Sequence, residues 1–400
     1  MKEKIPISGT EWEANLAKAL ALIKKSQTFL FAGDLDGDSV GSMVALALYF
    51  RLLFKETHIV LAEGLGDNLD FLQKIINFNS LPALSSSEDI IAIRDHIDTV
   101  VFFDTANTKL VPLYSTIKEH ILLKKRPVIE IDHHFGADSE EMTEYGIKLF
   151  RLANANTEII AEILSLLSSE YPDLSDPFSQ RNILVALITG ISWDTLGGHV
   201  VPYKEDYQHW ITRLGTGLED ATWTSGAAEP AETRKQKFGQ PEDVIEYMNY
   251  LDAEKKGCID SITARIRIDH GIASLNLLNS TYSEVQDDCR DYGSDWFDEL
   301  RTFLLNIVPE KAGKIGIVYY EGQNTEGIDC IFIKMRRAIG YKDFDLRQLE
   351  DDVRNVFSEE NYMGGGGHPG AVSFRIDHMP DPEFQSGLAK ILLSLKKAVS

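Results

Sequence analysis

The stretch Gly33-Asp34-Leu35-Asp36-Gly37-Asp38-Ser39-Val40-Gly41-Ser42 places three aspartates at alternate positions directly after an apolar run. The run at 28–32 predicts a buried strand, and the long apolar segment at 43–50 predicts a helix. The acidic turn would then lie between the carboxyl end of a strand and the start of a helix, where open α/β sheets bind ligands. Three close carboxylates repel one another unless a cation neutralises them, so the turn predicts a hard divalent metal with oxygen ligands. The alternative is an acidic turn that only caps the helix.

The composition indicates a globular protein of two or three domains. The chain has 400 residues, of which 44% are hydrophobic and 10% aromatic, enough for sizeable cores. The formal charge of -22 opposes tight nonspecific binding to long duplex DNA unless a basic patch is local. Small anionic ligands stay compatible with this charge, because a metal site can reverse the sign of the local field.

Cysteine usage and the amino-terminal sequence predict a cytoplasmic protein. Cys258, Cys289 and Cys330 form no CxxC pair, and such a sparse, odd set predicts buried free thiols in a reducing compartment. The first residues contain no apolar signal region, and no stretch approaches about 18 uninterrupted apolar residues. We therefore expect no membrane partner.

Strand and helix patterns alternate through the first half of the chain. This order predicts an α/β fold with a mainly parallel five-stranded sheet flanked by helices. The predicted strands are 28–32, 58–62, 100–103, 127–131 and 147–150. The predicted helices include 11–25, 156–169 and 179–191.

A second, smaller mixed α/β domain is predicted after a small and polar segment near 221–245. Its predicted strands are 262–268, 314–320 and 330–334, and its predicted helices are 294–306, 345–357 and 383–397. The predicted division is a first domain at 1–220, a linker at 221–256 and a second domain at 257–400.

Other predicted strands of the first domain also end in groups that bind metals. Asp104 follows the strand at 100–103, Asp132-His133-His134 follows the strand at 127–131, and Asp194 lies just beyond an apolar run at 183–191. Parallel strands bring their carboxyl ends to one edge, so these groups would converge with the acidic turn. Such a set could hold two divalent cations that share one carboxylate, and carboxylate with imidazole suits Mn²⁺ better than Mg²⁺. Taken singly, Asp104 could cap a turn and His133 could be a core histidine.

The second domain carries a glycine-rich stretch, Gly364-Gly365-Gly366-Gly367-His368-Pro369-Gly370-Ala371. Glycines allow close approach of the backbone, whose N–H groups can bind an anion, and His368 could add a hydrogen bond. The alternative is a flexible loop before a strand. Arg336, near the end of a predicted strand, offers a cation for phosphate or a base.

Together these motifs resemble those of the DHH phosphoesterases of the DHH plus DHHA1 type, over roughly 28–376. That superfamily includes RecJ exonucleases, nano-RNases that also dephosphorylate phosphoadenosine phosphate, and cyclic-dinucleotide phosphodiesterases. The resemblance implies that 1–220 is a DHH catalytic domain and 257–400 a DHHA1 substrate-binding domain. The implied metal ligands are Asp36, Asp38, Asp104, His133 and Asp194, with Asp104 as the bridge and His134 on the scissile phosphate. The implied substrate-binding residues are Arg336, Gly365, Gly366, Gly367 and His368.

The chain departs from the nano-RNase pattern at one position. Members of that group carry a metal-binding histidine four positions before the first motif aspartate, where this chain has Ala32. Asp34 is present instead, as in the RecJ form of the motif, and we expect it to supply or support the second metal. The departure weakens direct transfer of a nano-RNase substrate.

The leading functional hypothesis is a phosphodiesterase that hydrolyses short single-stranded oligonucleotides or dinucleotides, using a water activated by two metals. Mn²⁺ is the expected cofactor, with Mg²⁺ as the alternative, and a homodimer would fit the family. The alternatives are a phosphoadenosine phosphate phosphatase, a cyclic-dinucleotide phosphodiesterase, or an inactive nucleotide sensor. RecJ-like action on long DNA is disfavoured by the acidic charge.

Overall fold

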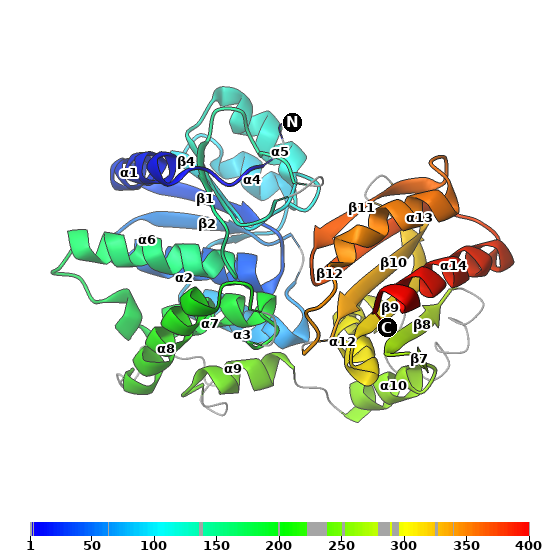
Figure 1. Cartoon of the computed structure of the whole chain (residues 1–400). Helices are drawn as coiled ribbons and strands as arrows, with labels where there is room; N and C mark the ends of the chain where they lie inside the picture. Colours follow the sequence, from blue (N-terminus) through cyan, green and yellow to red (C-terminus); the bar gives the residue numbers. More distant parts are fainter. Residues whose placement is uncertain are drawn as a thin grey trace. The chain divides into compact units, whose positions relative to one another are not determined.

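The chain forms two compact units, residues 1–250 (unit 1) and 251–400 (unit 2), in a computed structural model (Figure 1). The structure describes residues 2, 4–62, 64–135, 139–198, 201–221, 238–249, 253–278, 289, 296–324, 327–338 and 340–399. It does not describe the side chains of residues 253–256, 296–303 and 368.

Unit 1 is built on a parallel sheet in which six strands follow the order β3-β2-β1-β4-β5-β6. The strands are β1 (Thr28–Gly33), β2 (Glu56–Val60), β3 (Ala83–Leu84), β4 (Thr99–Phe103), β5 (Val128–Asp132) and β6 (Ile147–Phe150). The predicted mainly parallel sheet is confirmed, but it has six strands and not five. The additional strand, β3, is only two residues long, too short to give an alternating or apolar pattern.

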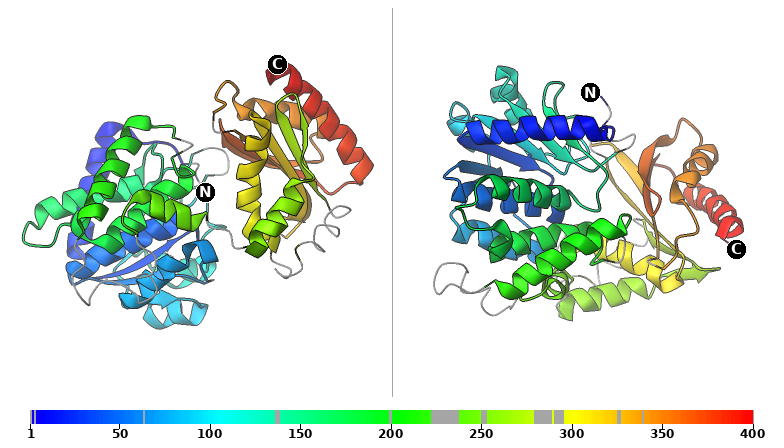
Figure 2. Two further views of the ribbon diagram at one scale, coloured as in Figure 1. Left: turned by 90° about the horizontal axis from the view of Figure 1, so that it is seen from below. Right: turned by 60° about the vertical axis from the view of Figure 1, so that its left-hand side comes forward.

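Helices cover both faces of this sheet (Figure 2). Residues of β1 alternate between the two cores: Phe31 packs with α2 and α7, while Leu30 packs with α4 and α5. This is the alternation that a strand buried on both faces requires. The helices of unit 1 are α1 (Gly9–Lys25), α2 (Gly37–Leu52), α3 (Asp70–Phe78), α4 (Ser87–Ile93), α5 (Tyr114–His120), α6 (Asn156–Glu170), α7 (Arg181–Asp194), α8 (Lys204–Asp220) and α9 (Pro241–Met248).

The strand order creates a switch point between β1 and β4. From β1 the chain continues outward to β2 and β3, whereas β4 continues to β5 and β6 in the other direction. In doubly wound sheets, ligands bind outside the carboxyl ends of the strands at such a point. The turn with Asp34, Asp36 and Asp38 follows β1, and Asp104 follows β4, so the fold places both acidic groups at the switch point.

Helix α2 is buried along almost its whole length, between the sheet and α7. Its residues Gly37 to Phe50 are all buried. Glycines allow the two helices to approach closely: a Cβ on Gly41 would lie 2.5 Å from the carbonyl oxygen of Ala186, and one on Gly37 would lie 2.7 Å from the ring of Trp193. The close approach brings the start of α2 near the end of α7.

Unit 2 contains a mixed sheet with the order β11-β12-β10-β9-β8-β7, in which only the β8–β9 pair is parallel among the paired strands described. The strands are β7 (Arg267–Asp269), β8 (Ile272–Leu277), β9 (Ile315–Gln323), β10 (Asp329–Arg337), β11 (Tyr362–His368) and β12 (Ala371–Asp377). Helices α13 (Leu349–Phe357) and α14 (Asp381–Val399) pack on one face, and α10 (Ala253–Thr263) and α12 (Trp296–Ala312) pack on the other. The predicted mixed α/β architecture is confirmed.

Two local structures considered from the sequence of unit 2 are not formed. The alternating residues at 262–268 predicted one strand, but 262 and 263 end helix α10 and only Arg267–Asp269 is a strand. The flexible loop considered as the alternative for the glycine-rich stretch is not formed either, because Tyr362–His368 is strand β11. Its backbone pairs with β12, for example Gly365 with Phe374, so hydrogen bonds to a neighbouring strand outweigh the low strand preference of glycine.

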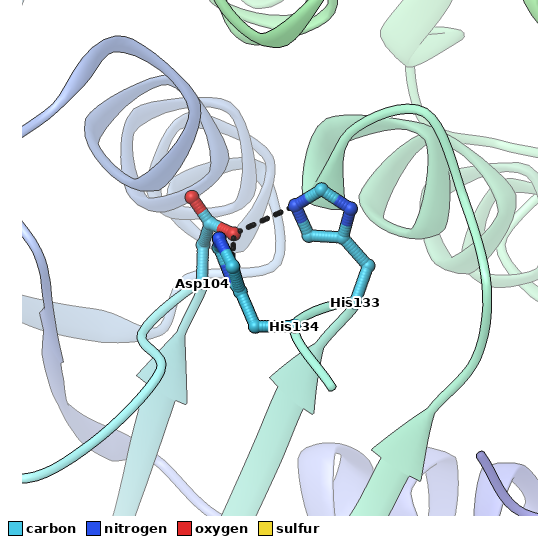
Figure 3. Close-up of side chains that lie close together, drawn as sticks. All are labelled: Asp104, His133 and His134. Carbon is cyan, nitrogen blue, oxygen red and sulfur yellow. Dashed lines mark ion pairs between the residues drawn. The ribbon is translucent and has the colours of Figure 1, made fainter. Parts of the chain in front are cut away.

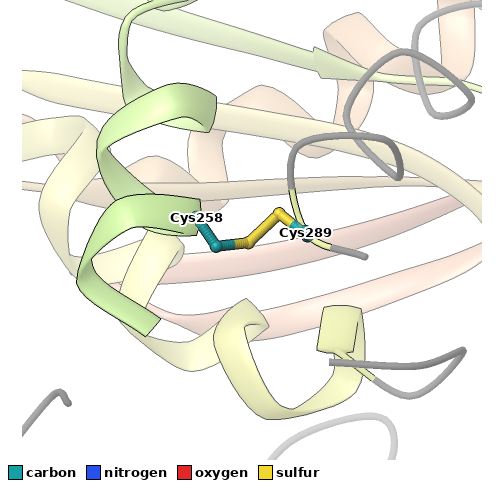
Figure 4. The surroundings of a disulfide bond; sticks show 2 residues. All are labelled: Cys258 and Cys289. Carbon is teal, nitrogen blue, oxygen red and sulfur yellow. A yellow bond between two sulfur atoms is a disulfide. The ribbon is translucent and has the colours of Figure 1, made fainter. Parts of the chain in front are cut away.

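The prediction of three free cysteines is also wrong. Cys258 of α10 and Cys289 form a disulfide, shown in Figure 4, and Cys330 is a buried free thiol. The two bonded cysteines are 31 residues apart, so no short-range motif announces the bond. With this disulfide, cysteine usage no longer argues for a reducing compartment.

The predicted linker at 221–256 is only partly described, because 222–237 and 250–252 lie outside the described residues. Within it, helix α9 buries Val244 and Met248 in the core of unit 1. Throughout the described part of the chain, we find no helix with the length and apolar character needed to span a bilayer.

The contact between α2 and α7 generates a prediction about stability. Gly41→Ala should destabilise the chain by about 1 to 3 kcal/mol, because the added methyl group meets backbone that cannot rotate away. Gly9→Ala is the control, since nothing lies within 4 Å of a Cβ at Gly9. Urea unfolding followed by tryptophan fluorescence would measure both. Equal midpoints for the two variants would contradict the close packing.

Candidate metal centre

Three turns at the carboxyl ends of β1, β4 and β5 carry the polar groups of the candidate site. Asp104 directly follows β4, while His133 and His134 directly follow β5, and Figure 3 shows these three side chains turned toward one another. Asp194 is the last residue of α7. The structure therefore brings together groups that are far apart in the sequence, up to the 156 positions between Asp38 and Asp194.

The His133 ring lies at the centre of this group. Its Nε2 atom is 3.1 Å from Asp104 Oδ1, 3.0 Å from Asp194 Oδ2 and 3.6 Å from Asp38 Oδ2. Its Nδ1 atom is 3.2 Å from the carbonyl oxygen of Ala153. A carbonyl can only accept, so Nδ1 carries a proton, and Nε2 can offer its lone pair to a cation when the ring is neutral. Ligand histidines are commonly oriented in this way.

Asp104 is held in a strained and buried position. Its backbone has φ 42°, in the left-handed region, which costs energy for a residue other than glycine. Both carboxylate oxygens are buried and lack a hydrogen-bond partner, as does His133 Nε2. Burial alone would raise the pKa of Asp104, but the nearby His134 and His133 hold that pKa well below its usual range.

Asp38 is fixed by the amino-terminal end of α6. Its carboxylate accepts hydrogen bonds from the backbone N–H of Asn156 and from the N–H and hydroxyl of Thr157, the latter two at 2.9 and 2.8 Å. A Cβ on Gly190 of α7 would collide with this carboxylate and with Thr157, so only glycine leaves room there. Burial, followed by the charges of Asp104 and Asp194, raises the pKa of Asp38 well above its usual value.

His134 is bound by two carboxylates. Its Nδ1 atom lies 2.9 Å from Asp132 Oδ1 and 3.3 Å from Asp104 Oδ1, and its backbone N–H donates to Asp132 Oδ1 at 2.8 Å. Burial would lower the pKa of His134, but Asp104 and Asp132 raise it well above its usual value. The side chain is 43% exposed, so the ring is accessible to a ligand.

Asp34 and Asp36 lie at the margin of the cluster. Asp36 caps α2, since its Oδ1 accepts from the backbone N–H of Asp38 at 3.0 Å and of Ser39 at 2.9 Å. Asp36 therefore caps the helix, which is the role that the sequence analysis gave as the alternative to metal binding by the acidic turn. Burial, followed by the charge of Asp104, raises the pKa of Asp36 well above its usual value. Burial also raises the pKa of Asp34.

Among the described residues, two groups could hold a metal ion: Asp104 with His133 and His134, and Asp38 with His133 and Asp194. Within each group the ligand atoms lie within 4.8 Å of one another. The oxygens of Asp104 and the Nε2 of His133 are close to one another but form no hydrogen bond, and they fit a cation because buried polar atoms are otherwise hydrogen-bonded. Asp34 and Asp36 belong to neither group, so their roles as ligands stay predictions.

Sequence patterns did not reveal the groups that support these ligands. Thr157 and the Ala153 carbonyl hold Asp38 and His133, and the buried Lys4 donates to Asp132. A Thr near the start of a predicted helix is a weak signal, since Thr is favoured at helix starts for other reasons. A lysine 128 positions from Asp132 gives no sequence signal at all.

The predicted substrate residues lie in unit 2. Arg336 is on β10, where its guanidinium donates to Asn306. Gly365, Gly366 and Gly367 lie on β11, and the side chain of His368 is outside the described residues. A Cβ on Gly365 would lie 2.5 Å from the ring of Phe374, so packing within the sheet already requires glycine there. Binding roles for these residues stay predictions.

The candidate centre predicts a specific loss of metal binding. Asp104→Asn should lower Mn²⁺ affinity at least tenfold, because it removes a negative charge from the candidate ligands. Asp98→Asn is the control: Asp98 precedes the same strand, and its carboxylate accepts hydrogen bonds from the N–H groups of Gln27 and Thr28. Isothermal titration calorimetry would measure both variants. Equal affinities would show that Asp104 is not a ligand.

The likeness of this chain to known proteins is one of structure. Neither the family models nor the curated proteins gave a match. Among solved structures, an exopolyphosphatase-related protein from Bacteroides fragilis is similar, with 14% identity and a TM-score of 0.66 over 97% of this chain and 98% of that one. An exonuclease RecJ bound to manganese has 13% identity and a TM-score of 0.47 over 97% and 94% of the two chains. A DHH domain described as a member of a family of ribosomal proteins has 12% identity and a TM-score of 0.45 over 98% and 93%. The likeness with a TM-score of 0.66 shows that the chain shares the α/β fold of the exopolyphosphatase-related protein.

Proposed function

We propose that this protein is a metal-dependent phosphodiesterase that hydrolyses short single-stranded oligonucleotides or dinucleotides. The observation that carries the proposal is the convergence of three carboxylates, those of Asp38, Asp104 and Asp194, around His133 at the switch point of the sheet. His133 Nε2 has one lone pair and can serve one cation only, so a carboxylate, for which we propose Asp104, would be shared between two cations, as in enzymes that use two cations for in-line attack on phosphorus. Mn²⁺ is the proposed cation because the groups combine carboxylate with imidazole.

The residues of unit 1 have distinct proposed roles. Asp38, Asp104, His133 and Asp194 would hold the cations, and Asp34 and Asp36 would support them. Bound divalent cations would supply an activated water and stabilise negative charge on the phosphate. His134, whose Nδ1 is bound to Asp132, keeps Nε2 to donate a hydrogen bond to a phosphate oxygen. The raised pKa of His134 favours the doubly protonated ring that this donation requires.

The charge of the chain supports a short substrate. A net charge of -22 repels a long phosphate backbone, whereas a dinucleotide presents few phosphates. In unit 2, Arg336 and the glycines of β11 are the proposed contacts to the rest of the substrate. They would supply positive charge and backbone N–H groups.

The structural neighbour with a TM-score of 0.66 is described as exopolyphosphatase-related. Short polyphosphate also offers a phosphorus for in-line attack, in a phosphoanhydride in place of a phosphodiester and without bases or sugars. It is therefore the second candidate substrate, and a direct comparison with dinucleotides separates the two.

Hydrolysis assays with Mn²⁺ would test the function. The substrates are an RNA and DNA series from dinucleotides to about twenty-mers, phosphoadenosine phosphate, cyclic dinucleotides and tripolyphosphate. We expect turnover that is greatest on the shortest linear oligonucleotides and is lost on chelation. Asp104→Asn should lower kcat at least a hundredfold, whereas Asp98→Asn should stay within threefold of the wild type.

Three other results of these hydrolysis assays would contradict the proposal. Rates that rise with oligonucleotide length would contradict the preference for short substrates and favour RecJ-like processing. Turnover of tripolyphosphate alone would replace the nucleotide substrate with polyphosphate. The absence of turnover of any substrate, with tight nucleotide binding retained, would refute the enzymatic proposal and favour a nucleotide sensor.

A further inference from the structure

Lys4 is a buried lysine next to the candidate metal centre. Its side chain is 1% exposed, which is unusual because lysine is almost never fully buried unless it is paired. The ammonium group donates to the Asp132 carboxylate and to the carbonyl oxygen of Thr105. It also lies 5.5 Å from the centre of the Phe150 ring.

The two acceptors connect Lys4 to both neighbouring strand ends of the site. Thr105 directly follows Asp104, whose backbone is in the left-handed region, so the bond to the Thr105 carbonyl secures the turn after β4. Asp132 ends β5 and binds His134 through Oδ1, while Lys4 binds Oδ2. The Asp132 carboxylate is thus held on both of its oxygens.

Backbone hydrogen bonds hold the amino-terminal segment in this position. The N–H of Lys4 donates to the carbonyl oxygen of Ser139 at 3.2 Å, and the N–H of Glu141 donates to the carbonyl oxygen of Lys2 at 2.8 Å. The N–H of Ile7 donates to the carbonyl oxygen of Phe150 at 3.1 Å. Lys4 therefore enters the site from a segment fixed at several points.

We propose that Lys4 is a positioning residue for His134. It fixes the Asp132 carboxylate, so that Oδ1 holds the Nδ1–H of His134 and the opposite ring nitrogen, Nε2, is kept for the phosphate. The proposal rests on the proposed phosphodiesterase function for its effect on rate. The Lys4 ammonium group contacts none of the proposed metal ligands. Substitution of Lys4 should therefore leave metal binding intact, whereas substitution of a ligand should weaken it.

The test compares Lys4→Met with Lys55→Met. Lys55 is also a buried lysine, but its ammonium binds the carbonyl oxygens of Ser26 and Lys24, which precede β1. The first measurement is a ¹⁵N spectrum of histidine-labelled protein with Mg²⁺ at pH 7, in which His134→Gln identifies the His134 signals. Lys4→Met should shift the Nδ1 signal of His134, and Lys55→Met should not. Unchanged His134 signals in Lys4→Met would overturn the proposal, whether or not the protein hydrolyses any substrate.

The second measurement is a kinetic double-mutant cycle. We expect Lys4→Met to lower kcat ten- to a hundredfold with KM within threefold and Mn²⁺ stoichiometry unchanged, as for other residues that orient a site. In the His134→Gln background, Lys4→Met should lower kcat less than twofold further, because the group through which it acts is gone. Fully additive losses, or a loss of Mn²⁺ binding, would overturn the proposal.

Removing Lys4 leaves a buried carboxylate without its cation, which can prevent folding. Lys4→Gln is the second variant, because its amide retains a donor for the Thr105 carbonyl. The same shift of the His134 signal is expected in Lys4→Gln, and its absence would overturn the proposal.

Discussion

Repulsion among like charges is the constraint on which the rest of the structure depends. The parallel sheet gathers Asp38, Asp104 and Asp194 around His133, where little water can separate their charges. Burial and the other two carboxylates raise the pKa of Asp38, whereas the two histidines lower that of Asp104. The cluster therefore needs positive charge to stay ionised. Histidine supplies part of it, and the buried atoms of Asp104 and His133 that form no hydrogen bond mark where a cation would supply the rest.

The scaffold holds this unfavourable cluster with rigid, close packing. Glycines at positions 37, 41 and 190 let α2, α6 and α7 meet at distances that any Cβ would prevent. The start of α6 then donates two backbone N–H groups and one hydroxyl to Asp38. Hydrogen bonds of this kind offset the free-energy cost of removing a carboxylate from water. Precise placement of the ligands thus comes from helix packing as much as from the strand ends.

Sequence patterns predicted those strands and site residues that depend on short stretches of the chain. Apolar runs marked the longer strands of unit 1, and the residues directly after them, Asp104 and His133, are adjacent in the structure because parallel strands end at one edge. Local patterns failed where tertiary contacts decide the outcome. Strand β3 has two residues, the glycines of β11 form a strand through pairing with β12, and Cys258 meets Cys289 across a core. Lys4 was missed for the same reason, since only the fold brings it to Asp132.

The distribution of cysteines makes the protein suited to site-specific labelling. Residues 1–250 contain no cysteine, and the thiols of Cys258 and Cys289 are consumed by their disulfide. Burial raises the pKa of the remaining thiol, Cys330, so its nucleophilic thiolate is scarce. A single cysteine placed on the surface of unit 1 would consequently be the one readily alkylated group under non-reducing conditions. A nitroxide attached there would report its distance from a paramagnetic ion such as Mn²⁺, so the position of a bound cation could be found by magnetic resonance without a crystal.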